Sequence, residues 1–352
     1  MTTPKTEKRK PVSYSDSGVS IDSANEAVKK ISGFAKSTFN ARTLTNIGSF
    51  GGMFNGSFPD MSEPILVASA DGVGTKLKIA FETNIHNTIG QDLVNHCVGD
   101  ILVQGAKPLF FLDYFATGKL SADVTASVVE GLSIACKETG CVLLGGETAE
   151  MPGFYSDGEY DLAGFIVGVV DKSKVIDGKN IEAGDVILGL PSVGLHTNGY
   201  SLARNLFFEI GGYGVDDRPE SLGGDSVGEV LLKPHRSYLP VLEGLLDKGV
   251  IKGLAHITGG GLLENIPRVL PENTSAEIKR GTWNELPVFD AMQKLGNVET
   301  QEMFRTFNMG IGMTIVCSEG DKEQIISHAK GLGEECFEIG TVVDGSGEVI
   351  LV

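Results

Sequence analysis

One stretch constrains this chain more than any other. It is residues 64–76, Pro64-Ile-Leu-Val-Ala-Ser-Ala-Asp71-Gly-Val-Gly-Thr75-Lys76. An apolar run of strand length ends in Asp71, a short loop with two glycines follows, and a helical pattern begins near Lys76. The loop offers a carboxylate for a divalent cation, backbone N–H groups at a helix start, and a lysine beside them. These groups suit Mg²⁺ and phosphate, although a Walker A loop would place its lysine directly after a glycine.

The composition restricts the class of partner. The chain has 352 residues, which is room for two domains. Its formal net charge of −17 argues against nucleic acid and against anionic membranes. The five cysteines are scattered, and neither a signal peptide nor an apolar run of about 20 residues is seen, so we expect reduced thiols in a cytoplasmic protein. Residues 1–12 are polar and are predicted to be a disordered tail.

Two further carboxylates are candidates for a metal site together with Asp71. Residues 87–105 are predicted to form a helix that carries Asp92, His96 and Asp100 along one face. A second strand, residues 141–144, runs into a glycine pair and Glu147, which repeats the order of the opening motif. A solvated polar face is the common explanation of such helical spacing. We nevertheless expect Asp71, Asp100 and Glu147 to form a cluster that binds a divalent cation.

Glycine-rich segments mark further candidate binding loops. Residues 47–56 mix glycines with aromatics, as in a loop that folds over a ligand or is simply mobile. A polar, turn-rich segment at 171–184 is the predicted domain boundary, so we expect an N-terminal domain at 13–172 and a C-terminal domain at 173–352.

The second predicted α/β unit contributes two loops of its own. The first carries His196, Thr197 and Asn198. The second is a turn of Thr258 and three glycines, Gly259 to Gly261, and it opens a helix. A glycine turn at a helix start is a good anion site, although such turns are more often only tight connections.

Taken in order, the motifs resemble one family. The phrases ASADGVGTKL, NHCVGDILVQGAKPLFFLDYFATGKL, GGETAEMPGFY, GLHTNGYSLAR and HITGGGLLENIPRVLP are similar to those of the phosphoribosylformylglycinamidine cyclo-ligases, and the resemblance covers about residues 13–350. It implies ATP-dependent cyclisation of formylglycinamidine ribonucleotide to aminoimidazole ribonucleotide in purine biosynthesis. It also implies a homodimer of two-domain α/β subunits, in which the N-terminal strands of both subunits form a shared β-barrel.

The resemblance implies roles for particular residues. Asp71, Asp100 and His196 are implied as catalytic, and Asp71, Asp100 and Glu147 as ligands of Mg²⁺, with K⁺ as a further candidate ion. ATP would be bound by Lys36, Gly48, Gly51, Gly52 and Glu147. The substrate would be bound by Gly72, Gly74, Thr75, Lys76, Thr197, Asn198, Thr258, Gly259, Gly260 and Gly261.

The sequence departs from the family pattern in three places. Ser20 stands where aspartate is usual, Ser49 replaces a frequent glycine, and Gly99 replaces the asparagine before Asp100, so we expect a polar contact to be lost there. The alternative function is another kinase or synthetase of the same superfamily. A selenophosphate synthetase would need a reactive cysteine upstream of Cys97, and a thiamine-phosphate kinase would show paired aspartates near the first motif. A non-catalytic nucleotide-binding protein is the other alternative.

Overall fold

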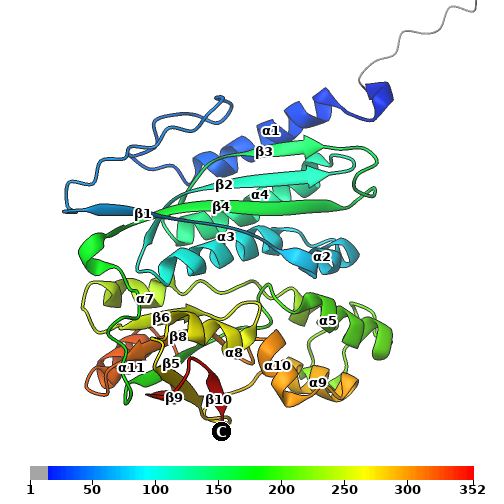
Figure 1. The fold of residues 1–352 in the computed structure, drawn as a ribbon. Coiled ribbons are helices and arrows are strands. Elements are labelled where there is room, and N and C mark those ends of the chain that lie inside the picture. The colour runs from blue at the N-terminus through cyan, green and yellow to red at the C-terminus, as the bar shows by residue number, and fades with distance from the viewer. Residues whose placement is uncertain (1–14) are drawn as a thin grey trace, which may run out of the picture.

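The computed structural model describes residues 15–352, and it contains two sheets, one in each half of the chain (Figure 1). The mixed α/β architecture predicted from the sequence is confirmed. The predicted tail at residues 1–12 lies outside the described residues. The first sheet ends at Asp171 and the second begins at Val186, while the predicted boundary between 172 and 173 stays a prediction.

The first sheet has four strands in the order β1-β4-β2-β3. Its strands are β1 (Pro64–Gly72), β2 (Lys107–Thr117), β3 (Val142–Glu150) and β4 (Tyr160–Asp171). β4 is antiparallel to both of its neighbours, and β2 is parallel to β3. The strands β1 and β3, which carry the predicted acidic motifs, are therefore the two edges of the sheet.

Two helices, α3 (Asn87–Leu102) and α4 (Ala122–Glu138), cover one face of this sheet (Figure 1). They approach each other closely because glycines lie at the crossing. A Cβ atom on Gly131 would lie 1.9 Å from the backbone oxygen of Asn87, and one on Gly90 would lie 2.1 Å from the oxygen of Val128. This close packing fixes α3 against the sheet, beside the end of β1.

The opposite face of the sheet is apolar and partly open. Side chains alternate along a strand, so Leu66 and Phe165 point away from α3, and they are 62% and 47% exposed. Helix α1 (Ile21–Lys36) packs on α4 and on the edge strand β3. Ser20 caps this helix, because its Oγ accepts from the Ser23 N–H at 3.2 Å, and its own N–H donates to Glu150 at 2.8 Å.

The second half is built on a six-stranded sheet of order β10-β7-β9-β5-β8-β6. The strands are β5 (Val186–Pro191), β6 (Gly253–His256), β7 (Thr274–Ile278), β8 (Ile311–Cys317), β9 (Phe337–Asp344) and β10 (Val349–Leu351). Its helices are α5 (Tyr200–Arg204), α6 (Val227–Leu231), α7 (Leu239–Leu246), α8 (Gly261–Asn265), α9 (Pro287–Gly296), α10 (Thr300–Thr306) and α11 (Lys322–Gly331). Helix α5 is followed directly by a π-helical segment, Asn205–Ile210.

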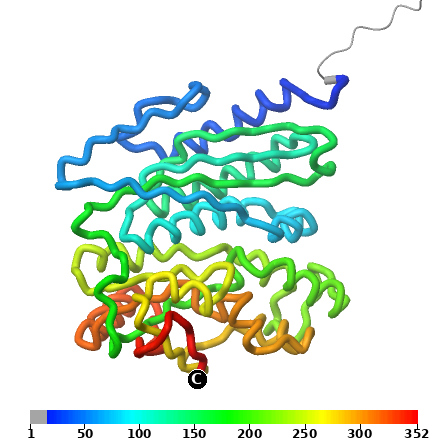
Figure 2. Tube along the Cα trace, viewed as in Figure 1, coloured from blue at the N-terminus to red at the C-terminus, as the bar shows by residue number. Residues whose placement is uncertain are grey.

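The two halves meet along α3, which lies between the first sheet and the second half of the chain (Figures 1 and 2). The short helix α2 (Leu77–Thr83) follows β1 through a 3-10 turn, Gly74–Lys76. Helix α7 begins at Leu239, and before it the N–H of His235 donates to Asp92 of α3 at 2.6 Å. Within residues 15–352, every helix is too short or too polar to cross a bilayer.

Candidate functional site

Asp71 is the second-to-last residue of β1, and its side chain is accessible to solvent. Its side chain is 43% exposed, and its Oδ1 accepts from the N–H of Gly72 at 2.6 Å. His96, on α3, places its Nε2 3.0 Å from Asp71 Oδ2. Burial is the largest single effect and would raise the pKa of Asp71, but the bond and charge of His96, the N–H of Gly72 and the charge of His256 together hold the pKa below its usual value. Asp71 is therefore an ionised carboxylate near neutral pH.

Asp100, one helical turn after His96, is the second carboxylate of this site. Its Oδ1 lies 2.9 Å from His256 Nδ1 and 3.9 Å from His96 Nε2, and its Oδ2 accepts from Ser69 Oγ at 3.0 Å. Burial is the largest single effect and acts to raise the pKa of Asp100, yet the bond and charge of His256, the charge of His96 and the bond from Ser69 together lower it overall. His256 comes from β6, so both halves of the chain contribute to the site.

Behind the two carboxylates lies a group of buried imidazoles. Thr197 Oγ1 is 2.7 Å from His96 Nδ1 and 3.2 Å from His235 Nδ1. His235 Nε2 in turn lies 3.0 Å from His256 Nε2. Burial lowers the pKa of His235 and of His256, whereas the carboxylates around His96 outweigh its burial and raise its pKa. The predicted substrate residue Thr197 thus contacts two histidines in the interior, His96 and His235, and His235 contacts the third, His256.

The resemblance implies a catalytic His196, and the structure places this residue in the interior. It is 1% exposed, and its ring stacks on His235 with the centroids 4.1 Å apart. Neither of its ring nitrogens has a hydrogen-bond partner among residues 15–352, and burial holds its pKa well below the usual value. A catalytic role for His196 would require the loop to move.

Lys76 also lies in the interior, so it neither faces solvent nor lines the carboxylate site. Its Nζ donates to Asp92 Oδ1 at 2.8 Å, to the His196 carbonyl at 2.9 Å and to the Lys233 carbonyl at 2.8 Å. Both side chains of the Lys76–Asp92 pair are fully buried. With all three donors used, Lys76 joins the halves of the chain, and a direct contact with substrate would break this arrangement.

Glu147 does not join Asp71 and Asp100 within one chain. Across the sheet, Asp71 pairs with Gly164, Gly164 with Asp113, and Asp113 with Gly146. Three strand spacings of about 4.8 Å separate the two edges, which places Glu147 roughly 14 Å from Asp71. The expected cluster of three carboxylates therefore does not form in the single chain, because the two similar motifs lie on opposite edge strands.

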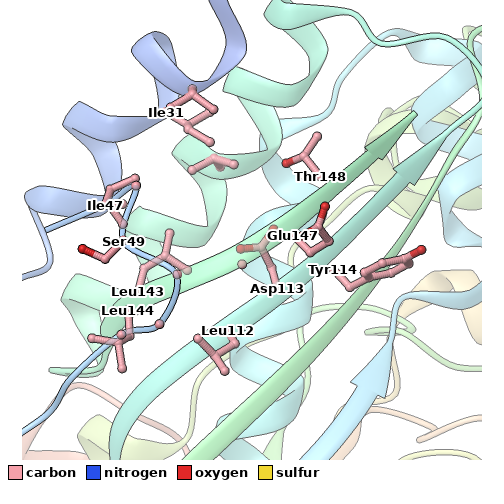
Figure 3. A pocket seen from close by; sticks show the side chains of 18 of the residues that line it. Ile31, Ile47, Ser49, Leu112, Asp113, Tyr114, Leu143, Leu144, Glu147 and Thr148 are labelled. Atoms are coloured by element: carbon pink, nitrogen blue, oxygen red, sulfur yellow. The ribbon is translucent and has the colours of Figure 1, made fainter. Parts of the chain in front are cut away.

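Glu147 instead lines a cavity of about 630 Å³ between α1, the segment 46–52 and the strands β2 and β3 (Figure 3). Most of the predicted ATP-binding residues line the same cavity, namely Gly48, Gly51, Gly52 and Glu147. Lys36, at the end of α1, is not among its lining residues. A Cβ on Gly52 would lie 2.4 Å from Leu144 Cγ, so the segment 46–52 can lie this close to β3 only with glycine there. Burial raises the pKa of Asp113 in the cavity to about 7, and the charge of Glu147 adds to this.

The remaining predicted substrate residues lie where the two halves meet. Thr75 Oγ1 is 3.1 Å from Ser201 Oγ of α5, and Gly74 before it has φ +60°. A Cβ atom built on Gly259 would lie 3.3 Å from Asn198 Oδ1, so the side chain of Asn198 lies close to the glycine turn. The glycine turn is held by Asn265, whose Nδ2 donates to the carbonyls of residues on the turn, Thr258, Gly259 and Gly261. The structure thus brings the loop at 197–198 and the turn at 258–261 together.

Comparisons with known proteins identify the family. The family model of the AIR synthase related protein N-terminal domain matches residues 60–170. The model of the C-terminal domain of the same family matches residues 182–352. The phosphoribosylformylglycinamidine cyclo-ligase of Alkaliphilus oremlandii (strain OhILAs) is 51% identical over 340 residues, which cover 97% of this chain and 99% of the relative. That of Syntrophotalea carbinolica is 52% identical and covers 97% of both chains. The chain belongs to the phosphoribosylformylglycinamidine cyclo-ligase family.

Solved structures show that the fold of this cyclo-ligase family member is shared more widely. Thiamine-monophosphate kinase from Stenotrophomonas maltophilia K279a has a TM-score of 0.69 at 16% identity and covers 93% of this chain and 95% of its own. The hydrogenase maturation protein HypE in complex with ATP has a TM-score of 0.64 at 17% identity and covers 90% of this chain and 88% of its own. At such low identity these structures support the fold alone.

The family resemblance predicted from the motifs is confirmed, while the roles of the individual site residues stay predictions. Sequence reasoning missed His256 and His235 as members of the carboxylate site of this cyclo-ligase family member. His256 is the last residue of β6 and lies two residues before the predicted glycine turn, so its position at a strand end was a usable signal. His235 follows Pro234 in a segment without periodicity, and no local signal identifies it.

Proposed function

We propose that the chain catalyses the ATP-dependent closure of formylglycinamidine ribonucleotide to 5-aminoimidazole ribonucleotide, a step of purine biosynthesis. The observation that carries this proposal is identity above 50% to named cyclo-ligases over 97% of the chain. In the proposed reaction the formyl oxygen attacks the γ-phosphorus of ATP, and ADP leaves. The amidine nitrogen then attacks the activated carbon, and that carbon–oxygen bond breaks to release phosphate.

The chain's own groups would act mainly by binding and orientation. The nucleophile and the electrophile belong to one substrate molecule, so holding the two in contact supplies much of the rate. Asp71 and Asp100 suit Mg²⁺ because both are partly exposed, ionised carboxylates beside the end of β1. When bound, Mg²⁺ would offset charge on the phosphates of ATP. Glu147 would lie outside this metal site in the same chain.

The cavity lined by Gly48, Gly51, Gly52 and Glu147 is the proposed nucleotide site. Its volume of about 630 Å³ falls in the range of small-molecule sites, and its walls are largely apolar with few polar groups, as a purine base would need. The structure of HypE with ATP shows a protein of the same fold with that nucleotide bound.

A homodimer is the proposed functional unit, and a barrel shared between two copies would cover the open face of the first sheet. Leu66 and Phe165 on that face are more exposed than is usual for apolar side chains that lie together on a strand surface. The cavity lies at the β3 edge of the first sheet, whereas Asp71 and Asp100 lie at the β1 edge. In the proposed dimer, the cavity of one chain would lie nearer to Asp71 and Asp100 of the other chain. Sedimentation velocity would test this, and a monomer at assay concentrations would contradict it.

The assay of the proposed function is phosphate release from ATP and Mg²⁺. We expect release to depend on added formylglycinamidine ribonucleotide. Release that this substrate does not stimulate would contradict the proposal, and stimulation by thiamine phosphate instead would favour a kinase of the same fold. The enzyme would work in the cytoplasm, in keeping with five cysteines that are all free.

A further inference from the structure

We propose that His96, Asp100 and His256 form a binding site for a divalent transition-metal ion such as Zn²⁺ or Co²⁺, with Asp71 beside His96 at its accessible side. The ligand atoms would be His96 Nε2, Asp100 Oδ1 and His256 Nδ1, which all lie within 4.8 Å of one another. Neutral imidazoles together with carboxylate are typical ligands of Zn²⁺ and of other first-row transition ions such as Co²⁺. Mg²⁺ instead prefers oxygen ligands alone. This inference goes beyond the proposed function.

The distances fit a common ion. Ligands about 2.1 Å from one ion lie about 3.0 Å apart at octahedral angles and about 3.4 Å apart at tetrahedral angles. His256 Nδ1 is 2.9 Å from Asp100 Oδ1, and His96 Nε2 is 3.0 Å from Asp71 Oδ2. The distance between His96 Nε2 and Asp100 Oδ1 is 3.9 Å and needs only a small side-chain adjustment, and the ligand atoms of His96 and His256 lie within 4.8 Å of each other. The imidazoles are buried and Asp71 is accessible, so an ion could enter from the Asp71 side.

The far nitrogens of both imidazoles are already held, as in established metal sites. His96 Nδ1 contacts Thr197 Oγ1, and His256 Nε2 contacts His235 Nε2. If His96 carries its proton on Nδ1 and His256 carries its proton on Nε2, the two ligand nitrogens are free. His235 can then accept from His256 and donate through Nδ1 to Thr197, which satisfies each of these contacts with neutral rings.

Gly99 allows His256 to reach this position. A Cβ atom at residue 99 would lie 2.6 Å from His256 Cε1 and 2.8 Å from its Nδ1. The family resemblance led us to expect asparagine here and a lost polar contact. In this chain the ring of His256 occupies the space beside Gly99 and contacts Asp100. The glycine and the imidazole therefore act together to place a nitrogen ligand at the carboxylate.

The proposed ion would also connect the two halves of the chain, since His96 and Asp100 lie on α3 and His256 lies on β6. A transition ion and Mg²⁺ would compete for the carboxylate of Asp100. The nitrogen donors favour the transition ion in this competition.

The test is metal binding to the full-length chain without a histidine tag. Chelator-treated protein is titrated with Co²⁺ alone and followed by visible absorption, and the bound metal is counted by elemental analysis. We expect one Co²⁺ per chain with ligand-field bands, loss of the bands when Zn²⁺ is added, and their persistence in a large excess of Mg²⁺. Wild-type protein that binds no Co²⁺, or loses it to Mg²⁺, would overturn the proposal. Normal phosphate release in that protein would leave the proposed function standing.

Two variants and one control locate the site. His256→Gln removes a ligand, and Gly99→Ala displaces the same ring without removing one, so both should weaken Co²⁺ binding by at least about 10–100-fold. His328→Gln on α11 is the control, because His328 bonds the Val241 carbonyl far from this site, and it should bind Co²⁺ as the wild type does. Wild-type affinity in Gly99→Ala and His256→Gln, with the folds verified by circular dichroism, would overturn the assignment.

Discussion

Asp71→Asn and Asp100→Asn are each expected to lower substrate-dependent ATP turnover by about 10³-fold or more, with the protein still folded. The amide keeps the shape of the side chain but removes the charge that holds a cation. The side chains of Asp71 and Asp100 are 43% and 23% exposed, so the fold does not depend on burying them. The measurement is steady-state ADP formation, with thermal unfolding followed on the same samples.

Asp123→Asn is the matched control for these two variants. Asp123 lies on α4, is 90% exposed and pairs only with Lys30 at the surface. Its turnover should equal that of the wild type. Wild-type rates in Asp71→Asn or in Asp100→Asn would show that the altered carboxylate is not part of the reaction site.

Lys76→Met is expected to lower the free energy of unfolding by about 3–5 kcal/mol. The substitution leaves Asp92 without its counter-charge in a place where both side chains are fully buried. Asp92 would then keep only the N–H of His235 as a donor, and its second oxygen already lacks a partner. Burial raises the pKa of Asp92 to about 6 even in the presence of Lys76, which shows how weakly the site solvates a charge. Urea unfolding at fixed protein concentration measures the loss.

The double variant Lys76→Met with Asp92→Leu separates this cause from a simple packing defect. Because it removes both charges, it should be more stable than Lys76→Met alone, although the N–H of His235 loses its acceptor. Lys78→Met is the control, since Lys78 pairs with Glu159 at the surface and such pairs contribute about 0–1 kcal/mol. A loss below about 1 kcal/mol in Lys76→Met, or a double variant no more stable than it, would contradict the role of the buried pair.

The local elements were predictable because each has a local signal. The strand before Asp71, the apolar stripe of α3 and the glycine after α4 are read from residues within a few positions of one another. The cavity residues Gly48, Gly51 and Gly52 follow from the family resemblance, and the structure brings them together with Glu147.

The errors concern partners that are distant in the sequence. Glu147 was expected beside Asp71 because both end similar strands, but the order of strands in a sheet is a tertiary property that strand pattern does not encode. Lys76 resembles a phosphate-binding lysine in its motif, and only the packing of the second half shows that its three donors are used. His256 is 156 residues from Asp100, and its contact depends on the missing side chain of Gly99.

The central claim is that ATP activates the formyl oxygen and that the same molecule then closes its ring. Substrate labelled with ¹⁸O at the formyl oxygen tests it most directly, because the label can be followed in the products by mass spectrometry. We expect one labelled oxygen in each phosphate released, in step with ADP and aminoimidazole ribonucleotide. Ring closure with unlabelled phosphate, or no ring closure with ATP present, would contradict the account.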